Sequence, residues 1–281
     1  MKITHVLSQM FELPADEPLA DGPQVKGATR PFVLVKVAAG SVEGIGVAFF
    51  GAAMTRTLKQ SVDDLGALMI GMDATNVERI AAKLRDAASS AGPQGIFTLA
   101  LSALDMALWD IRGKHLSQPV SRLLGGHRDK VPAYASGALM RQFTLKEVES
   151  AGRKLVERGW KAMKTQLALP GHTTPDIEVN RIKVLREAIG PDVQLMCDIN
   201  QRWTAYQAIS IGQRVEPYHL HWLEDVTRAD DFQGLATVTA ALKTPIAGGE
   251  YVWGIEPFRQ MLERRSVDIA MIDLVRVGGI T

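Results

Sequence analysis

The sequence predicts an α/β protein, in which a (β/α) barrel of the TIM type follows an N-terminal α+β domain. From residue 131 onward, short apolar strands alternate with amphipathic helices, and from the second of these strands on they begin 23 to 33 residues apart, the length of one βα unit. This period is typical of a parallel barrel or a doubly wound sheet. We favour the barrel because no glycine-rich phosphate loop follows the first strand, and because polar residues recur at the C-terminal ends of the strands.

Six strands are expected in the barrel region, with helices between them: Val131–Ser136, Lys161–Gln166, Gln194–Asn200, His221–Val226, Pro245–Glu250 and Asp268–Asp273. A closed barrel needs about eight such units. We therefore expect the C-terminal units to be missing from the visible chain, which stops at Thr281 after the sixth strand. The expected domains are an α+β domain over residues 1–128 and an incomplete barrel over residues 129–281.

The N-terminal region is predicted to form a β-hairpin followed by helices. The hairpin strands are expected at residues 32–37 and 46–50, and helical spacing of apolar residues predicts helices over 57–71, 76–89 and 96–114. Four of the 13 prolines lie at positions 14, 18, 23 and 31. We therefore expect a mobile loop over about residues 12–31.

Composition excludes several classes of protein. The 281 residues carry 32 Lys+Arg against 31 Asp+Glu, so no strong positive field favours nucleic acid. The longest uncharged apolar stretch, Gly44–Met54, is 11 residues long, too short for a membrane span. The only cysteine, Cys197, cannot form an internal disulfide, and the N-terminus lacks the apolar segment of a signal peptide. We expect a cytoplasmic protein without nucleic-acid or membrane partners.

Three consecutive strands each deliver one carboxylate to the same rim of the barrel. Asp198, Glu224 and Glu250 are 26 residues apart in turn, and each lies on the inward face of its strand. A single acid at a strand end is explained by capping of the next helix, whereas three anions at one site need a cation between them. Ligation by oxygen alone is typical of magnesium.

Other polar residues near this rim fall on one face or the other. Lys164 and Gln166 end the preceding strand on the inward face, and Asn200 shares the face of Asp198. His219 and His221 lie on the face opposite Glu224, so we expect them to point toward the helices. We expect Cys197 to be a small buried residue of the core.

Taken together, the motifs resemble the mandelate racemase subgroup of the enolase superfamily over essentially the whole chain. The motifs are Ala103-Leu104-Asp105-Met106-Ala107-Leu108-Trp109-Asp110, Leu123-Leu124-Gly125-Gly126, Lys164-Thr165-Gln166, Asp198-Ile199-Asn200, Leu223-Glu224-Asp225, Gly249-Glu250, and Asp273 through Gly278-Gly279-Ile280-Thr281. The resemblance implies an α+β capping domain on a modified barrel, and a loop of the capping domain that closes over the barrel mouth.

The resemblance also implies a chemistry. Asp198, Glu224 and Glu250 would hold Mg²⁺, and the proton α to a substrate carboxylate would be removed to give an enediolate that the metal and Lys164 stabilise. Asp273 matches the acid that orients a catalytic histidine on the seventh strand, beyond Thr281. Asn200 is expected to bind substrate, which would be a small hydroxy-carboxylate, and the protein is expected to form a homo-oligomer.

Gln166 departs from the family pattern. The family's second strand usually carries Lys-x-Lys, and the second lysine is a general base, whereas an amide cannot accept and hold a proton at neutral pH. Racemisation by two opposed bases loses one of them, but dehydration can proceed with a single histidine. The sequence therefore predicts a sugar-acid dehydratase, a lyase, and places a racemase or epimerase second. Cycloisomerisation of the muconate type is less favoured, because Asp273 stands where that subgroup has a lysine.

Two further interpretations stay open. In one, Gln166 marks a relative that binds metal and carboxylate without turnover. In the other, the barrel binds phosphate through units that the visible chain does not contain. The sequence beyond Thr281 would discriminate between them.

Overall fold

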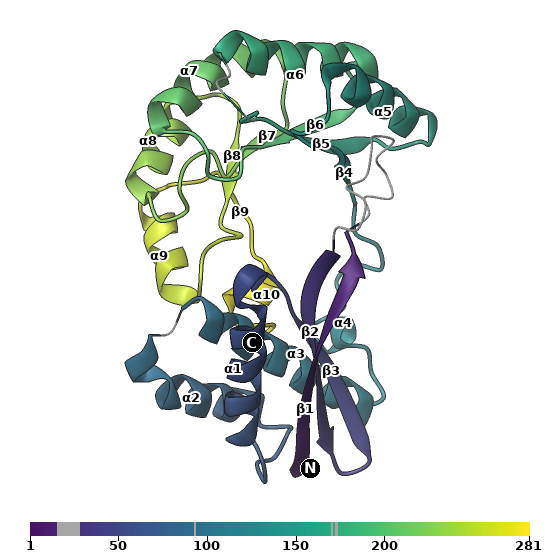
Figure 1. Ribbon diagram of the computed structural model, residues 1–281, viewed down its shortest axis with the longest axis vertical. Coiled ribbons are helices and arrows are strands. Elements are labelled where there is room, and N and C mark those ends of the chain that lie inside the picture. Colours follow the sequence, from purple (N-terminus) through teal and green to yellow (C-terminus); the bar gives the residue numbers. More distant parts are fainter. Residues whose placement is uncertain (16–28, 93, 170, 172–173) are drawn as a thin grey trace.

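The computed structural model describes residues 1–15, 29–92, 94–169, 171 and 174–281. Its N-terminal domain lies on one side of an arc of parallel strands whose helices cover the outside (Figure 1). Two separate apolar cores, one for each of these parts, agree with the expected α+β unit and barrel-like unit.

The N-terminal domain is an antiparallel sheet covered by helices. The sheet order is β1-β2-β3, with β1 at Ile3–Pro14, β2 at Thr29–Ala39 and β3 at Val42–Ala48. Helices α1 (Thr55–Ala67), α2 (Val77–Ala87) and α3 (Ile96–His115) follow, with short helices η1 (Ala52–Met54), η2 (Ser89–Ala91) and α4 (Val120–Leu123). The predicted hairpin and the three predicted helices are confirmed, but the first strand was not predicted.

The expected loop over residues 12–31 is shorter than the prolines suggest. Strand pairing continues through Glu12↔Pro31, Leu13↔Arg30 and Pro14↔Thr29. Pro14 lies at the very end of an edge strand, where a missing N–H breaks no internal ladder bond. Residues 16–28, which make up the rest of the expected loop, lie outside the described residues.

Helix α3 lies directly on β3, because two glycines allow a close approach. A Cβ atom at Gly44 would lie 2.0 Å from the carbonyl oxygen of Ala107, and one at Gly46 would lie 1.8 Å from that of Ala103. The Asp110 carboxylate, one turn further along α3, accepts a hydrogen bond of 2.9 Å from the N–H of Ile45. The small residues of the Ala103–Asp110 motif therefore serve the packing of helix on sheet.

The barrel domain contains a parallel sheet in the order β4-β5-β6-β7-β8-β9. Its strands are β4 (Ala135–Leu139), β5 (Ala162–Gln166), β6 (Gln194–Asp198), β7 (Trp222–Glu224), β8 (Ile246–Gly248) and β9 (Ile269–Ala270). Its helices are α5 (Leu145–Glu157), α6 (Pro175–Ile189), α7 (Ala205–Val215), η3 (Glu216–Tyr218), α8 (Phe232–Ala241), α9 (Ile255–Glu263) and α10 (Leu274–Val277). Six parallel strands are confirmed, but the first lies at Ala135–Leu139, later than the predicted Val131–Ser136, and the last is limited to Ile269–Ala270. The sheet is a partial TIM barrel with edges at β4 and β9.

The last residues of the chain dock on α3 of the N-terminal domain. The N–H of Gly278 donates to Ser102 Oγ at 3.0 Å, and that of Thr281 donates to Asp105 Oδ2 at 3.0 Å. Burial raises the pKa of Asp105, and the hydrogen bonds from Thr281 oppose this rise. Asp105 thus ties the segment after β9 to the N-terminal domain. Over the described residues, no helix is both long and apolar enough to cross a membrane.

Candidate metal centre and active site

The carboxyl ends of β6 and β7 bring three acidic side chains together. Asp198 ends β6, Glu224 ends β7, and Asp225 follows directly; one carboxylate oxygen from each lies within 4.8 Å of the others. All three side chains are buried. Parallel pairing sets Asp198 opposite Glu224 in register, so the sheet itself places these two acids side by side.

Lys164 supplies a positive charge to this cluster. Its Nζ lies 2.6 Å from Glu224 Oε1 and 3.9 Å from Asp198 Oδ2, and it sits 5.5 Å from the centre of the Tyr134 ring. Burial disfavours the Lys164 ammonium, but the charge and hydrogen bond of Glu224, together with the charge of Asp198, outweigh burial and raise the pKa of Lys164. The other oxygen of Glu224 accepts a hydrogen bond of 2.9 Å from Trp222 Nε1. Glu224 is therefore fixed from both sides.

Asp225 is the member of the cluster that the sequence did not predict. Its φ of 46° is left-handed, so the alternation of faces that holds within β7 stops at Glu224 and the next side chain returns to the site. Burial raises the pKa of Asp225 to about 8, and the charges of Glu250, Glu224 and Asp198 act in the same direction. Its Oδ2 atom is buried and lacks a hydrogen-bond partner among the described residues.

Glu250, the third predicted metal ligand, is not part of this close cluster. One of its oxygens lies 3.4 Å from Nη1 of Arg276, whose guanidinium carbon lies 3.7 Å from the centre of the Phe50 ring and 4.3 Å from that of Tyr251. Arg276 Nη1 also lies 3.4 Å from Asp273 Oδ2. Asp273 itself caps α10, where its Oδ1 accepts from the N–H of Val275 at 2.8 Å.

Gln166 lies beside Asp198, as its position on the inward face of β5 predicts. Asn200 lies there too, although β6 ends at Asp198 and Asn200 has a left-handed φ of 50°. Asn200 donates to both oxygens of Asp198, from its backbone N at 2.8 Å and from Nδ2 at 2.7 Å. Gln166 Nε2 donates to Asn200 Oδ1 at 3.1 Å. Arg141, which sequence reasoning missed, also donates to Asn200 Oδ1, at 2.6 Å. Its only sequence signal is that it follows the first barrel strand, on the rim where the other polar residues lie.

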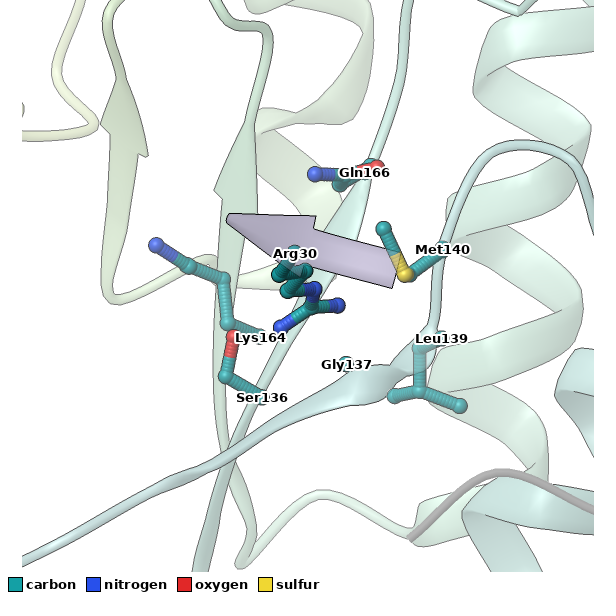
Figure 2. Close-up of a pocket in the computed structure, with 7 residues that line it drawn as sticks. All are labelled: Arg30, Ser136, Gly137, Leu139, Met140, Lys164 and Gln166. Atoms are coloured by element: carbon teal, nitrogen blue, oxygen red, sulfur yellow. The ribbon is translucent and has the colours of Figure 1, made fainter. Parts of the chain in front are cut away.

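A pocket opens in front of Lys164 and Gln166. Its cavity of about 310 Å³ is lined by Arg30, Ser136, Gly137, Leu139, Met140, Lys164 and Gln166. Figure 2 shows that Lys164 and Gln166 come from the same strand, whereas Arg30 is brought in from β2 of the N-terminal domain. The pocket therefore combines cationic and amide groups from both domains, a suitable lining for a polar anionic molecule.

The residues expected to lie outside the acidic cluster do lie outside it, although His219 and His221 are exposed. His221 packs against the ring of Trp222, with centroids 5.1 Å apart, and neither it nor His219 belongs to the acidic cluster. Cys197 is fully buried, and burial raises the pKa of its thiol well above the ordinary value. Neither histidine nor thiolate therefore contributes a ligand to this cluster.

The residues of the acidic cluster fit a hard divalent cation. All the candidate ligand atoms are carboxylate oxygens, the donors that magnesium prefers. The buried, unpartnered Oδ2 of Asp225 and the mutual repulsion of three close acids are both relieved by a bound cation.

Comparison with known proteins agrees with this geometry. Residues 24–125 match the family model described as mandelate racemase / muconate lactonizing enzyme, N-terminal domain, and residues 146–281 match the model described as enolase C-terminal domain-like. The chain is 30% identical over 286 residues to L-talarate/galactarate dehydratase of Salmonella typhimurium, covering 100% of this chain and 71% of that protein. It is 34% identical over 288 residues to D-galactarolactone cycloisomerase of Agrobacterium fabrum, covering 99% of this chain and 73% of that protein.

Solved structures give the same result. An enolase from Bradyrhizobium, complexed with magnesium and mandelic acid, superimposes with a TM-score of 0.89 at 30% identity and covers 99% of this chain and 76% of its own. L-Talarate dehydratase from a Polaromonas species, complexed with Mg and L-glucarate, gives a TM-score of 0.89 at 27% identity, with coverage of 99% and 74%. The chain thus belongs to the mandelate racemase and muconate lactonizing enzyme family of the enolase superfamily.

Proposed function

We propose that this protein is a magnesium-dependent lyase that dehydrates a sugar acid, after removal of the proton α to the substrate carboxylate. The observation that carries the proposal is Gln166. It lines the pocket beside Lys164 at the end of β5, and its amide cannot serve as the second base that racemisation requires. The similarity to sugar-acid dehydratases supports the same assignment.

The metal would be held by Asp198 and Glu224, with Glu250 as the third predicted ligand and Asp225 as a further carboxylate beside them. Bound Mg²⁺ stabilises negative charge that develops on the substrate carboxylate. Lys164, ion-paired with Glu224 in the centre of the site, adds a fixed positive charge to the same region. It contributes by electrostatic stabilisation.

Three residues are assigned to substrate and proton handling. Asn200 keeps one N–H of its Nδ2 free of Asp198 and can donate it to a hydroxyl or carboxylate oxygen of the substrate. Arg30 faces the pocket with a cationic side chain and suits an anionic substrate. Asp273, which caps α10 at the end of β9, keeps the role that the family pattern assigns to it, the orientation of a catalytic histidine.

The substrate class is a small hydroxy-carboxylate, as the glucarate and mandelate complexes of related structures support. The cytoplasmic location and the homo-oligomer remain predictions. Light scattering on the purified protein at micromolar concentration would measure its mass, and a monomer would contradict the prediction of an oligomer.

The test of the proposed function is an assay for 2-keto acid. The enzyme is incubated with Mg²⁺ and a panel of aldonic and aldaric acids, and keto product is measured with and without EDTA. We expect keto acid from at least one sugar acid, only with metal present, and loss of that activity in Glu224→Gln. Interconversion of mandelate-like enantiomers without keto product would instead establish a racemase.

A further inference from the structure

We infer that Gln166 is a positioning residue: with Arg141 it locks the side-chain amide of Asn200, and through Asn200 it fixes the carboxylate of Asp198. Gln166 therefore has a structural role in addition to replacing the general base that relatives carry at this position. The inference rests on the proposed function in one respect, since it takes Asp198 to be a ligand of the metal used in the reaction.

The first link joins Asn200 to Asp198. Asn200 has a left-handed φ of 50°, which turns the chain sharply just after β6 and brings its backbone N–H onto Asp198 Oδ1 at 2.8 Å. Its Nδ2 donates to Oδ2 of the same carboxylate at 2.7 Å. Both oxygens of Asp198 are therefore held by one residue, which fixes the plane of the carboxylate.

The second link decides which way the Asn200 amide faces. Its Oδ1 accepts a charge-assisted hydrogen bond of 2.6 Å from Arg141 Nη2 and a neutral hydrogen bond of 3.1 Å from Gln166 Nε2. If the amide flipped, its NH₂ group would meet two donors and its oxygen would meet the Asp198 carboxylate. Two donors on Oδ1 thus keep Nδ2 aimed at Asp198.

The third link explains why this position suits glutamine. The Oε1 atom of Gln166 accepts from the backbone N–H of Arg141 at 3.4 Å, so both ends of the amide are used. A lysine here could not accept from that N–H and would set a second cation beside the Arg141 guanidinium. A glutamate would turn an acceptor toward Asn200 Oδ1. Glutamine has the required length, one donor, one acceptor and no charge.

The loops that carry this network are anchored from behind by α6. The buried carboxylate of Glu178 accepts from the N–H groups of Ala168 and Leu169, at 3.1 and 3.0 Å. The buried Arg181 donates to the carbonyl oxygens of Phe143 and Met140, at 2.9 and 2.6 Å.

Arg141 itself closes the gap between the two loops. Its Nε donates to the carbonyl oxygen of Leu167 at 2.8 Å, which ties the loop after β4 to the loop after β5. Because both loops are fixed by buried groups, the network is already assembled in the protein alone, and its loss should be visible without substrate.

The experiment compares Gln166→Met with Gln142→Met. Methionine is close to glutamine in size but removes both hydrogen bonds, and Gln142 is an exposed amide in the loop after β4 that serves as a matched control. Magnesium affinity is measured by titration calorimetry without substrate. We expect Gln166→Met to weaken it by about 10-fold, as is common when a group that orients a metal ligand is lost. The control should match the parent.

A second readout separates positioning from contact with the reacting atoms. In turnover, Gln166→Met should raise the Mg²⁺ concentration needed for half-maximal rate. Saturating Mg²⁺ should restore most of the rate of the parent. A large loss of kcat at saturating metal with unchanged metal affinity would overturn the inference. Equal magnesium affinities for Gln166→Met and the parent would also overturn the inference. If Glu224→Gln weakened magnesium binding in the same experiment, the proposed function would still stand.

A third readout needs no metal. The side-chain NH₂ signals of Asn200, assigned by their loss in Asn200→Asp, should exchange with water slowly in the parent and about tenfold faster in Gln166→Met. If the parent bound no magnesium, the proposed function would fall, and this exchange rate alone would decide the inference. Equal exchange in parent and variant would overturn it.

Discussion

Replacement of Lys164 by methionine should have opposite effects on stability and on metal affinity. Lys164 Nζ lies 2.6 Å from Glu224 Oε1, and the exposed fractions of the two side chains are 12% and 0%. Removal of one partner from a buried ion pair costs about 3–5 kcal/mol, because the other charge stays buried without its partner. The neighbouring Asp198, 3.9 Å from Nζ, loses the same cation.

Metal-free Lys164→Met should therefore have a free energy of unfolding lower than the parent by about 3–5 kcal/mol, a large part of the roughly 5–15 kcal/mol typical of a native protein. Magnesium should bind the variant more tightly than the parent, because Lys164 repels the cation at the same carboxylates. Keto-acid formation should nevertheless fall, since the fixed charge that favours the enediolate is lost.

The assay is urea unfolding in EDTA and in excess Mg²⁺, followed by circular dichroism, with titration calorimetry for the metal. The surface variant Lys183→Met, on the exposed side of α6, is the control for loss of a lysine. Equal stability of Lys164→Met and the parent in EDTA, or weaker magnesium binding by Lys164→Met, would refute the electrostatic role of Lys164.

Three further predictions concern Asp225, Glu224 and Gly46. The pKa of buried Asp225 is about 8, against an ordinary 3.8, so between these pH values the folded state keeps a proton that the unfolded state releases. The free energy of unfolding of the metal-free protein should therefore fall as pH rises from about 4 to about 8. Asp225→Asn should remove that fall, and identical urea midpoints for variant and parent at pH 5 and pH 8 would contradict it. Glu224→Gln should weaken magnesium binding sharply in calorimetry, because it removes a charge from the centre of the cluster; an unchanged affinity would exclude Glu224 as a ligand. Gly46→Ala should lower the free energy of unfolding by several kcal/mol in urea, since its Cβ would lie 1.8 Å from Ala103 O; a urea midpoint equal to that of the parent would contradict the close contact.

Strand periodicity, together with the polar residues at the strand ends, was sufficient to predict the barrel domain. Short apolar segments at intervals the length of one βα unit predicted the six parallel strands, because each unit repeats the same local physics. The first strand of the N-terminal domain was missed for a local reason. Of β1, only Ile3 is fully buried, so the strand is half-exposed at the sheet edge and lacks an apolar signature.

The candidate site was predicted where strand alternation holds. Asp198, Lys164 and Gln166 lie within strands, and alternation placed them on the inward face. Asp225 was missed because the left-handed turn after β7 breaks that alternation. Arg141 was missed because its contacts depend on where the loop after β4 runs, which tertiary packing against α6 determines.

Loss of the α-proton with formation of a keto acid is the most direct test of the central claim. The enzyme and Mg²⁺ are incubated in D₂O with each acid of the aldonic and aldaric panel, and the product and the recovered substrate are examined by NMR. We predict that a 2-keto acid forms only when Mg²⁺ is present. The recovered substrate should contain no epimer at the carbon α to the carboxylate. Recovery of the epimer, deuterated at that carbon and without keto acid, would contradict the account.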